Sequence, residues 1–428
     1  MSALPEETLR RGWCPSTLRP METGDGWLVR LHPPDAKLTP AQLRRIAALA
    51  AEHGNGLVEI SARANLQLRG VTAESHPRLV ERLLAEHLVD EHDGDGPQRV
   101  TLVSPLAGQD PTAMIDAAAL ALQIEQSTRA LSGLPAKLAI VVDDGSAQAL
   151  DEFPCDIRLL GIGTGTAAVC LADRLWQGPV AEADAIAAVE TALRRFAALR
   201  SAAPDHLRRL RDLPADALAS LTDLPATAAP APRRRPRRVG TFTLKGDRFA
   251  ALIGLPFGRC DATVLDRLGA TVETSAADIR LSPWRALAFR GLHHSEAERL
   301  LALAGDLGLI TRDDDPRLSV QACAGSPACS RAEAPAMADA NVIAEAAADL
   351  LAEGVTLHVS GCVKACAHPA AADLTLVGRN GRYDVVPRGT TRDKPVATLD
   401  LSALLTRLQP GQDIHARLKA ARSMGSQG

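Results

Sequence analysis

The hydrophobic pattern of the chain contains one strand–helix–strand unit twice. Residues 59–71 align with residues 280–292 at a constant offset, and the two stretches share a serine, a leucine and a terminal Arg-Gly pair. An apolar strand and a helix precede each copy: residues 27–31 and 39–53 before the first, residues 249–255 and 262–272 before the second. Chance similarity of short apolar patterns is the alternative, but the shared positions favour a duplication. Neither copy can bury a sheet face alone, so we expect the two to pair.

A longer segment with mixed helix and strand patterns follows each copy. Alanine- and leucine-rich periodicity predicts helices over residues 111–131, 183–199 and 335–353. Short apolar runs predict strands at residues 356–360 and 373–377, and Asn380-Gly381 indicates a hairpin turn after them. Each small repeated unit is therefore expected to lead into a larger α/β segment.

Residues 225–238 separate the two halves of the chain. They contain four prolines and five arginines. Proline denies the backbone regular hydrogen-bond donors, and the like charges repel one another. We therefore predict an extended, solvated linker in preference to a basic recognition arm.

Composition narrows the class of protein. Hydrophobic residues make up 46% of the 428 residues and charged residues 23%, which suits a folded chain of two or three domains. The formal net charge of −3 argues against a general affinity for nucleic acid or an anionic membrane. No stretch approaches the roughly 20 apolar residues of a membrane span, and the N-terminus lacks an apolar signal region, so we expect a cytoplasmic protein. Its eight cysteines are then expected to be thiols, metal ligands or catalysts rather than disulfides.

Four of the eight cysteines form two closely spaced pairs. Cys323 and Cys329 have a Cys-x5-Cys spacing in a loop of small residues, and Cys362 and Cys366 have a Cys-x3-Cys spacing directly after a predicted strand. Residues four apart share one face of a helical turn, and Gly361 allows the backbone to approach closely. A buried thiolate is costly without a compensating cation, and 4Fe-4S clusters take four cysteines. We therefore predict that these four residues bind a 4Fe-4S cluster.

Structural zinc is the main alternative, since zinc also binds four cysteines, although zinc ribbons usually contain Cys-x2-Cys pairs. Unligated core cysteines are a further alternative. The other four show no paired spacing and are expected to be buried apolar thiols: Cys14, Cys155, Cys170 and Cys260. The role of Cys14 stays open, because Trp13-Cys14-Pro15 directly precedes the first repeat.

The arrangement around the cysteines resembles the signature of the nitrite and sulfite reductase superfamily. Ser360-Gly361-Cys362, then Cys366 and, after six further residues, Asp373-Leu374 satisfy its second half. The resemblance covers essentially the whole chain and implies an α+β fold, in which two pseudo-symmetric ferredoxin-like halves pair and two larger α/β lobes enclose a tetrapyrrole. The implied division is residues 1–75 and 239–300 for the halves, 76–224 and 301–428 for the lobes, and 225–238 for the linker.

By the same resemblance, polar and cationic side chains bind the tetrapyrrole carboxylates. Arg63 and Gln67 fill Arg-x3-Gln positions, Arg99 matches the second arginine of the family, and Lys137 matches its first active-site lysine. The planar guanidinium group suits bidentate capture of carboxylates. The full predicted set is Arg63, Gln67, Arg69, Arg99, Lys137 and Lys364, and no catalytic residue is predicted.

Departures from the reductase pattern argue against reduction of sulfite or nitrite. Ala64 and Ala139 replace a glutamine and a second lysine, and residues 362–366 read Cys-Val-Lys-Ala-Cys where reductases have Cys-Pro-Asn-x-Cys. Such chemistry needs cations and proton donors around the bound anion. Within the superfamily, the chain instead resembles the precorrin-3B synthase family of aerobic cobalamin biosynthesis, on residues 63–70, 104–108, 281–285 and 360–369.

This narrower resemblance implies that the tetrapyrrole is a substrate, precorrin-3A, which is hydroxylated with molecular oxygen and converted to a γ-lactone. It also implies a mononuclear non-haem iron. Non-haem iron often binds two histidines and one carboxylate, so His293, His294 and His368 are candidate ligands. Neighbouring histidines in a strand would face opposite sides of the sheet, which argues against His293 and His294 as a pair. For His368 a helix-capping or solvent-facing role is favoured. Residues 161–166 match the nucleotide-binding spacing incompletely and are expected to be a strand and turn. We therefore expect a separate reductase or ferredoxin to supply electrons.

Two other functions stay open. The first is a siroheme-dependent sulfite or nitrite reductase, in which siroheme would be a permanent cofactor. The second is a non-catalytic iron–sulfur electron-transfer or sensor protein, which the cationic positions in the first half of the chain disfavour because a simple carrier needs no such pocket.

Overall fold

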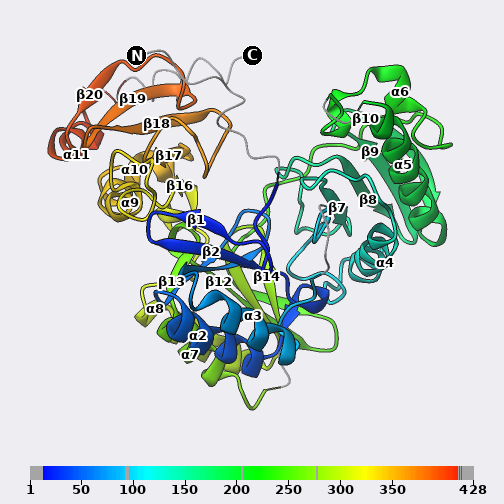
Figure 1. The fold of residues 1–428 in the computed structure, drawn as a ribbon, viewed down its shortest axis with the longest axis horizontal. Coiled ribbons are helices and arrows are strands. Elements are labelled where there is room, and N and C mark those ends of the chain that lie inside the picture. Colours follow the sequence, from blue (N-terminus) through cyan, green and yellow to red (C-terminus); the bar gives the residue numbers. More distant parts are fainter. Residues whose placement is uncertain are drawn as a thin grey trace.

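Within the described residues, the chain forms four five-stranded sheets (Figure 1). The structure is a computed structural model, and it describes residues 13–91, 96–203, 206–275, 278–412, 414 and 416. In the view of Figure 1, the two repeated units lie together at the bottom, with one lobe (cyan to green) on the right and the other (yellow to red) on the left. This mixture of helices and sheets confirms the predicted α+β fold class.

Each repeated unit forms one sheet, and the two sheets exchange a strand. In chain order, the first unit supplies β1 (Met21–Thr23), β2 (Gly26–Leu31), β3 (Lys37–Leu38), β4 (Leu57–Ile60) and β5 (Leu66–Val71), and the second supplies β11 (Gly240–Leu244), β12 (Arg248–Gly254), β13 (Arg259–Asp261), β14 (Asp278–Ser282) and β15 (Ala286–Leu292). Strand β13 of the second unit pairs with β4, while β3 of the first unit pairs with β14. Each unit therefore covers an edge of the other's sheet, which confirms that the two copies pair.

Helices pack on these two sheets and share one apolar core with them. They are α2 (Pro40–His53), α3 (His76–Ala85), α7 (Ala262–Thr271) and α8 (His294–Asp306). Helix α2 begins within a residue of its predicted start, because Thr39 and Gln42 form a reciprocal capping box ahead of Pro40. Leu68 and Phe289, from opposite units, are fully buried in the same apolar core. Burial of this shared surface holds the two units together.

The first lobe follows the first unit. It contains β6 (Thr101–Val103), α4 (Ala117–Arg129), β7 (Ile140–Asp143), β8 (Ile157–Gly163), β9 (Thr166–Leu171), β10 (Leu175–Ala181), α5 (Glu182–Ala202) and α6 (Ala215–Ala219). The second lobe contains β16 (Val320–Ala322), α9 (Ala336–Ala346), α10 (Ala348–Ala352), β17 (Leu357–Ser360), β18 (Ala372–Arg379), β19 (Arg382–Gly389), β20 (Ala397–Leu399) and α11 (Leu401–Leu408). In both lobes the first three strands are parallel and the last two pair antiparallel. The lobes therefore repeat each other as the small units do.

Short 3-10 helices join these elements: η1 (Pro34–Ala36), η2 (Leu210–Asp212), η3 (Pro256–Gly258) and η4 (Pro316–Ser319). The first and third lie at equivalent places in the two repeated units. Asp35 in one and Phe257 in the other both have positive φ, 51° and 53°. The duplication thus extends to details of the backbone that the sequence pattern does not reveal.

Most predicted elements of the lobes are confirmed, with two differences. The helix expected from residue 111 begins only at Ala117, because Asp116 caps it with a hydrogen bond to the Ala119 amide. The single helix expected over residues 335–353 is broken into α9 and α10 at Ala347. The Asn380-Gly381 turn joins β18 to β19 with both residues at positive φ, as a tight hairpin requires. Residues 161–166 form the predicted strand and turn.

The structure corrects the expectation that the linker is solvated throughout. Arg233 forms ion pairs with Asp143, which is fully buried, and with Asp151. Arg238 is also buried, and its Nη1 donates to the Leu318 carbonyl at 2.7 Å. Composition alone predicted repulsion among the linker arginines, whereas carboxylates and carbonyls elsewhere in the chain compensate two of them.

None of the helices in the described ranges combines the length and the apolar character needed to cross a membrane.

Candidate active site

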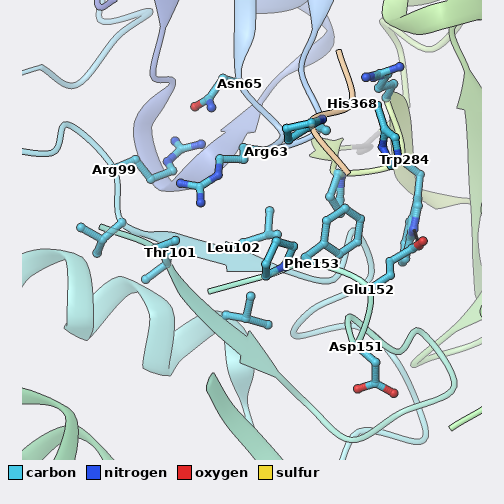
Figure 2. Close-up of a pocket in the computed structure, with 18 of the residues that line it drawn as sticks. Arg63, Asn65, Arg99, Thr101, Leu102, Asp151, Glu152, Phe153, Trp284 and His368 are labelled. Atoms are coloured by element: carbon cyan, nitrogen blue, oxygen red, sulfur yellow. Dashed lines mark hydrogen bonds between the residues drawn. The ribbon is translucent and has the colours of Figure 1, made fainter. Parts of the chain in front are cut away.

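A large cavity lies where the two repeated units, both lobes and the linker meet. Its volume is about 1040 Å³. Arg30 and Arg63 line it from the first unit, Trp284 from the second, Arg235 from the linker, and His368 from the second lobe. In the view of Figure 2, Arg63 and Arg99 lie at one end of this cavity, and His368 and Trp284 at the other. No single segment could form this site, because every part of the fold contributes a wall.

Cationic side chains dominate the cavity lining. Asp151, Glu152 and Asp173 are the carboxylates among its lining residues. Ten arginines line the same space: Arg19, Arg30, Arg63, Arg99, Arg158, Arg233, Arg235, Arg238, Arg285 and Arg317. A concave, positively charged site of this kind suits a ligand with several carboxylates.

Equivalent turns of the two units present different side chains to this cavity. Ala64 and Arg285, which are aligned in the repeat, both have positive φ, at 51° and 56°. In each unit a serine hydroxyl accepts a backbone hydrogen bond from the residue two positions later, and those residues are Arg63 and Trp284. The duplicated turn therefore offers a cation from one unit and an aromatic ring from the other.

Arg30 is a cavity residue that the sequence did not single out. It extends from β2, and its Nε and Nη2 donate to Gln67 Oε1 at 3.1 and 2.8 Å. Gln67 in turn donates to Glu59 at 3.2 Å. Burial lowers the pKa of Arg30, against the opposing effects of Cys14 and Glu91. Gln67, predicted to touch the substrate, does not line the cavity and instead orients Arg30.

Arg69 is also outside the cavity lining, and its contacts favour a structural role rather than the predicted role in substrate binding. The buried guanidinium forms an ion pair with Asp25 at 2.6 Å and a longer one with Glu59 at 3.5 Å. Its Nη2 also donates to the Ala328 carbonyl at 3.0 Å, in the loop between Cys323 and Cys329. Arg69 thus connects the first unit to the cysteine-bearing lobe.

Of the other three predicted cations, Arg99 lines the cavity, whereas Lys137 and Lys364 do not. Arg99 lines it, and its Nη2 donates to the Pro33 carbonyl at 2.7 Å. Lys137 is exposed and lies between Ala136 and Leu138, two residues that line the cavity. Lys364 is half-buried in the loop between Cys362 and Cys366, where its charge favours the thiolate forms of those cysteines.

The two cysteine loops lie together, as the sequence predicted. Cys323 and Cys329 follow β16, Cys362 and Cys366 follow β17, and these strands are parallel neighbours. The Gly361 amide donates to Cys323 Sγ at 3.1 Å. A Cβ atom on Gly361 would lie 2.8 Å from the Ala332 Cβ and 3.1 Å from the Gly325 Cα. Glycine is therefore required for the close approach of the two loops.

The electrostatics of Cys362 and Cys366 fit an iron–sulfur cluster. Desolvation, reinforced by the neighbouring cysteines, raises the pKa of the half-buried Cys362 and raises the pKa of Cys366, which is exposed at the cavity, to about 11. Thiols in this environment stay protonated unless a cationic centre binds them. A cluster provides such a centre, and the Gly361 amide that donates to Cys323 Sγ would stabilise and orient a sulfur ligand. Cys366 also lines the cavity, so this end of the site borders the ligand space.

No group of three or more His, Cys, Asp or Glu side chains within the described ranges is arranged to hold one metal ion. Each cysteine of a 4Fe-4S cluster binds a different iron, so such ligands lie farther apart than those of a single ion. The described residues therefore offer no compact set of ligands for the alternative zinc site. The same part of the chain also offers none for the mononuclear iron that the family resemblance implies.

His368 and His358 pack against each other at the cavity end of the second lobe. Their rings are T-shaped, with centroids 5.7 Å apart. His358 is fully buried on β17, and neither ring nitrogen has a hydrogen-bond partner in the described part of the chain. Burial lowers its pKa to about 4, so it is neutral near neutral pH. His293 and His294, at the start of α8, do not line the cavity.

The remaining cysteines behave largely as predicted. Cys155, Cys170 and Cys260 are buried, and burial raises the pKa of Cys170 to about 11 and that of Cys260 to about 12. Cys14 is half-buried and lines the cavity beside Arg30.

Comparisons with known proteins agree with this architecture. The sequence model of the nitrite/sulfite reductase ferredoxin-like half domain matches residues 19–86. A precorrin-3B synthase from Sinorhizobium sp is 33% identical over 417 residues, which cover 92% of this chain and 86% of the relative. A ferredoxin-type sulfite reductase from Mycobacterium tuberculosis is 26% identical and covers 82% of this chain and 70% of its own. The solved structure of the Mycobacterium tuberculosis NirA protein matches with a TM-score of 0.69 and 21% identity, covering 91% of this chain and 83% of that chain, which shows the shared fold.

Proposed function

Because the chain belongs to the precorrin-3B synthase family of the nitrite and sulfite reductase superfamily, we propose that it catalyses the oxygen-dependent hydroxylation of precorrin-3A and the formation of a γ-lactone. The reaction would make it an oxidoreductase of the monooxygenase type. Monooxygenation inserts one oxygen atom into the substrate and releases the other as water, which consumes two electrons and two protons.

The observation that carries this proposal is the cavity with ten arginines and three carboxylates beside the cysteine loops. Precorrin-3A is a macrocycle with carboxylates around its rim. Arg63 and Arg99 would bind carboxylates at one end, and Arg285 would do so near the second lobe. Nη1 of Arg285 is buried without a hydrogen-bond partner among the described residues. A buried donor of this kind is expensive unless a ligand satisfies it.

The apolar part of the lining suits the face of a macrocycle. Phe153 and Trp284 lie with ring centroids 5.8 Å apart, and Trp284 Nε1 donates to Glu152. In Figure 2, these two rings lie apart from Arg99 in the cavity, and apolar walls of this kind with a few polar groups are typical of ligand sites. In this arrangement the arginines would bind the carboxylates at the rim of the macrocycle, and the aromatic side chains would pack against its apolar face.

Cys323, Cys329, Cys362 and Cys366 would hold the 4Fe-4S cluster, which supplies electron transfer when bound. We propose that electrons come from a separate reductase or ferredoxin. No described set of residues fits the implied mononuclear iron, so no step is assigned to it. The residues of this chain bind and orient the substrate and exclude water from it.

A siroheme-dependent reductase is the second candidate, because relatives in the superfamily include sulfite and nitrite reductases. One observation disfavours it: Ala139 lines the cavity where reductases carry their second lysine. Without that cation, the site has less stabilisation for a small, highly charged anion such as sulfite.

The proposal is tested by purifying the protein without oxygen and incubating it with precorrin-3A, a reductant and labelled oxygen. One labelled oxygen atom in the lactone product is expected. An unlabelled product would contradict the monooxygenase assignment. Absorption of the purified protein separates the reductase, because bound siroheme has a strong band that a cluster alone lacks. A protein that binds no tetrapyrrole would favour the electron-transfer or sensor alternative.

A further inference from the structure

A second, smaller cavity opens off the large one. Its volume is about 330 Å³, and it lies between the first lobe, η1 and β14. The two cavities share six lining residues: His32, Arg63, Gln98, Arg99, Thr101 and Leu102. The smaller cavity is therefore a side pocket at the end of the main site that holds Arg63 and Arg99.

Arg280 lines this side pocket and is the most unusual charge in it. The residue is 4% exposed, and its Nε is buried with no hydrogen-bond partner in the described part of the chain. Burial, followed by repulsion from Arg290, lowers its pKa to about 9. Asp278, the acidic residue two positions before Arg280 on the same strand, is already engaged by Arg290. The Arg290 guanidinium donates to its two carboxylate oxygens at 2.7 and 2.6 Å.

Other cations adjoin Arg280 rather than compensating it. Lys37 lies directly opposite on the neighbouring strand β3, an arrangement that is unfavourable for like charges. Arg99 also repels Arg280. Lys37, Arg99 and Arg280 thus all line this pocket, and an uncompensated buried charge is strongly unfavourable in the absence of a ligand.

The carboxylates that line the side pocket are mostly engaged elsewhere. Asp90 pairs with Arg129, Glu125 accepts from Thr101, and Asp116 caps α4. Asp35 is the exception: it is exposed, and its attraction to Arg280 is outweighed by burial and by repulsion from Arg290. The protein therefore leaves the charge of Arg280 for a ligand to neutralise.

We propose that Arg280, with Lys37 and Arg99, binds one peripheral carboxylate of the tetrapyrrole substrate, whose side chain enters this side pocket from the main cavity. The inference rests on the proposed function for the identity of the substrate. Continuity of the two cavities through Arg63 and Arg99 favours an arm of the same ligand over a free anion. Arg280 then acts as a specificity residue, since the pocket would reject a macrocycle that lacks this carboxylate.

The test measures binding of precorrin-3A to the anaerobic protein and to the Arg280→Met variant, together with thermal unfolding of both. We expect binding to weaken roughly tenfold or more, while the ligand-free variant unfolds at a temperature no lower than the parent protein. This pair of results identifies a ligand-binding residue, because removing a merely structural arginine would lower the unfolding temperature. Arg312→Met, at an exposed arginine paired with Asp314, is the matched control and should change neither quantity.

Unchanged precorrin-3A binding by the Arg280→Met variant would overturn the inference and leave the proposed function intact. Failure of the parent protein to bind precorrin-3A would instead reject the proposed function. Should inorganic phosphate alone raise the unfolding temperature of the parent protein but not of the variant, and precorrin-3A bind equally to both, the side pocket would be a free-anion site. Lys37→Met provides a second variant at the pocket edge, with weaker binding expected, if Arg280→Met does not fold.

Discussion

Arg69 donates a hydrogen bond of 3.0 Å from Nη2 to the carbonyl of Ala328, the residue directly before Cys329. Its counterpart in the second unit, Arg290, donates to the Ala107 carbonyl in the first lobe at 2.8 Å. The same duplicated arginine thus fastens each unit to a loop of a lobe. In one case that loop carries two of the predicted cluster ligands, Cys323 and Cys329.

Replacing Arg69 with Met should destabilise the fold by about 3 kcal/mol, because Asp25 loses its buried cation. Burial raises the pKa of Asp25, but the hydrogen bonds that Arg69 donates outweigh this effect and lower the pKa. The carboxylate is therefore charged and needs this cation. Iron should also be lost faster from the variant, since the Cys329 loop is no longer held. Arg290→Met is the matched control: it should destabilise comparably and retain iron normally. Equal iron retention in both variants would contradict the assigned role.

Replacing Cys323 with Ser should abolish assembly of the cluster. The parent protein is expected to contain about four irons per chain, and the variant close to none. Iron and acid-labile sulfide analysis of the anaerobically purified proteins measures this directly. Cys260→Ala is the control, because Cys260 is buried in the shared core of the two units and should not affect iron. Full iron content in Cys323→Ser would refute the four-cysteine site.

Replacing Arg63 with Met should weaken precorrin-3A binding roughly tenfold, because one charge-assisted contact with a carboxylate is lost. The side chain is open to the cavity, so the fold should be unaffected. Fluorescence titration under nitrogen measures the dissociation constant. Lys137→Met belongs in the same series. Because Lys137 is exposed and beside the lining rather than in it, we expect a smaller change, and an equal loss would restore the full role that the sequence predicted.

Replacing Arg233 with Met should cost about 3 kcal/mol of stability, because the fully buried Asp143 carboxylate loses its cation. Burial opposes the charge of Arg233, yet the hydrogen bonds that it donates to Asp143 and Asp151 raise its pKa. Urea unfolding measures the loss. Arg234→Met is the control at the adjacent, exposed linker position, and it should be neutral. Equal unfolding free energies for Arg233→Met and Arg234→Met would contradict a structural role for Arg233.

His358 should make stability depend on pH between about 6.5 and 4. Its pKa is near 4 in the folded protein and 6.5 when unfolded, so the unfolded chain binds an extra proton in this range. Stability is therefore lost as the pH falls below 6.5, by about 2 kcal/mol at pH 5. Urea unfolding of the parent protein and of His358→Leu at pH 7.5 and 5 should show a smaller decline in the variant. The stability of His294→Gln, a control at an exposed histidine, should fall with pH as much as that of the parent protein.

The sequence by itself determined the features that depend on local order along the chain. These features involve only a few neighbouring residues, so they can be recognised in the linear sequence. They are the Cys-x5-Cys and Cys-x3-Cys spacing, the Arg-Gly end of each repeat and the Asn380-Gly381 turn. The duplicated units, most lobe elements and the meeting of the two cysteine loops were accordingly predicted.

Only the tertiary structure decided which arginines face the ligand space. An arginine in a sequence looks the same whether it pairs with a carboxylate, as Arg69 does, or lines a cavity, as Arg30 does. The difference arises from partners far away in the chain: Arg233 meets Asp143 across 90 residues, and Arg280 faces Arg99 from the other half. Charge compensation depends on distance in space and on burial, and neither is a property of sequence spacing.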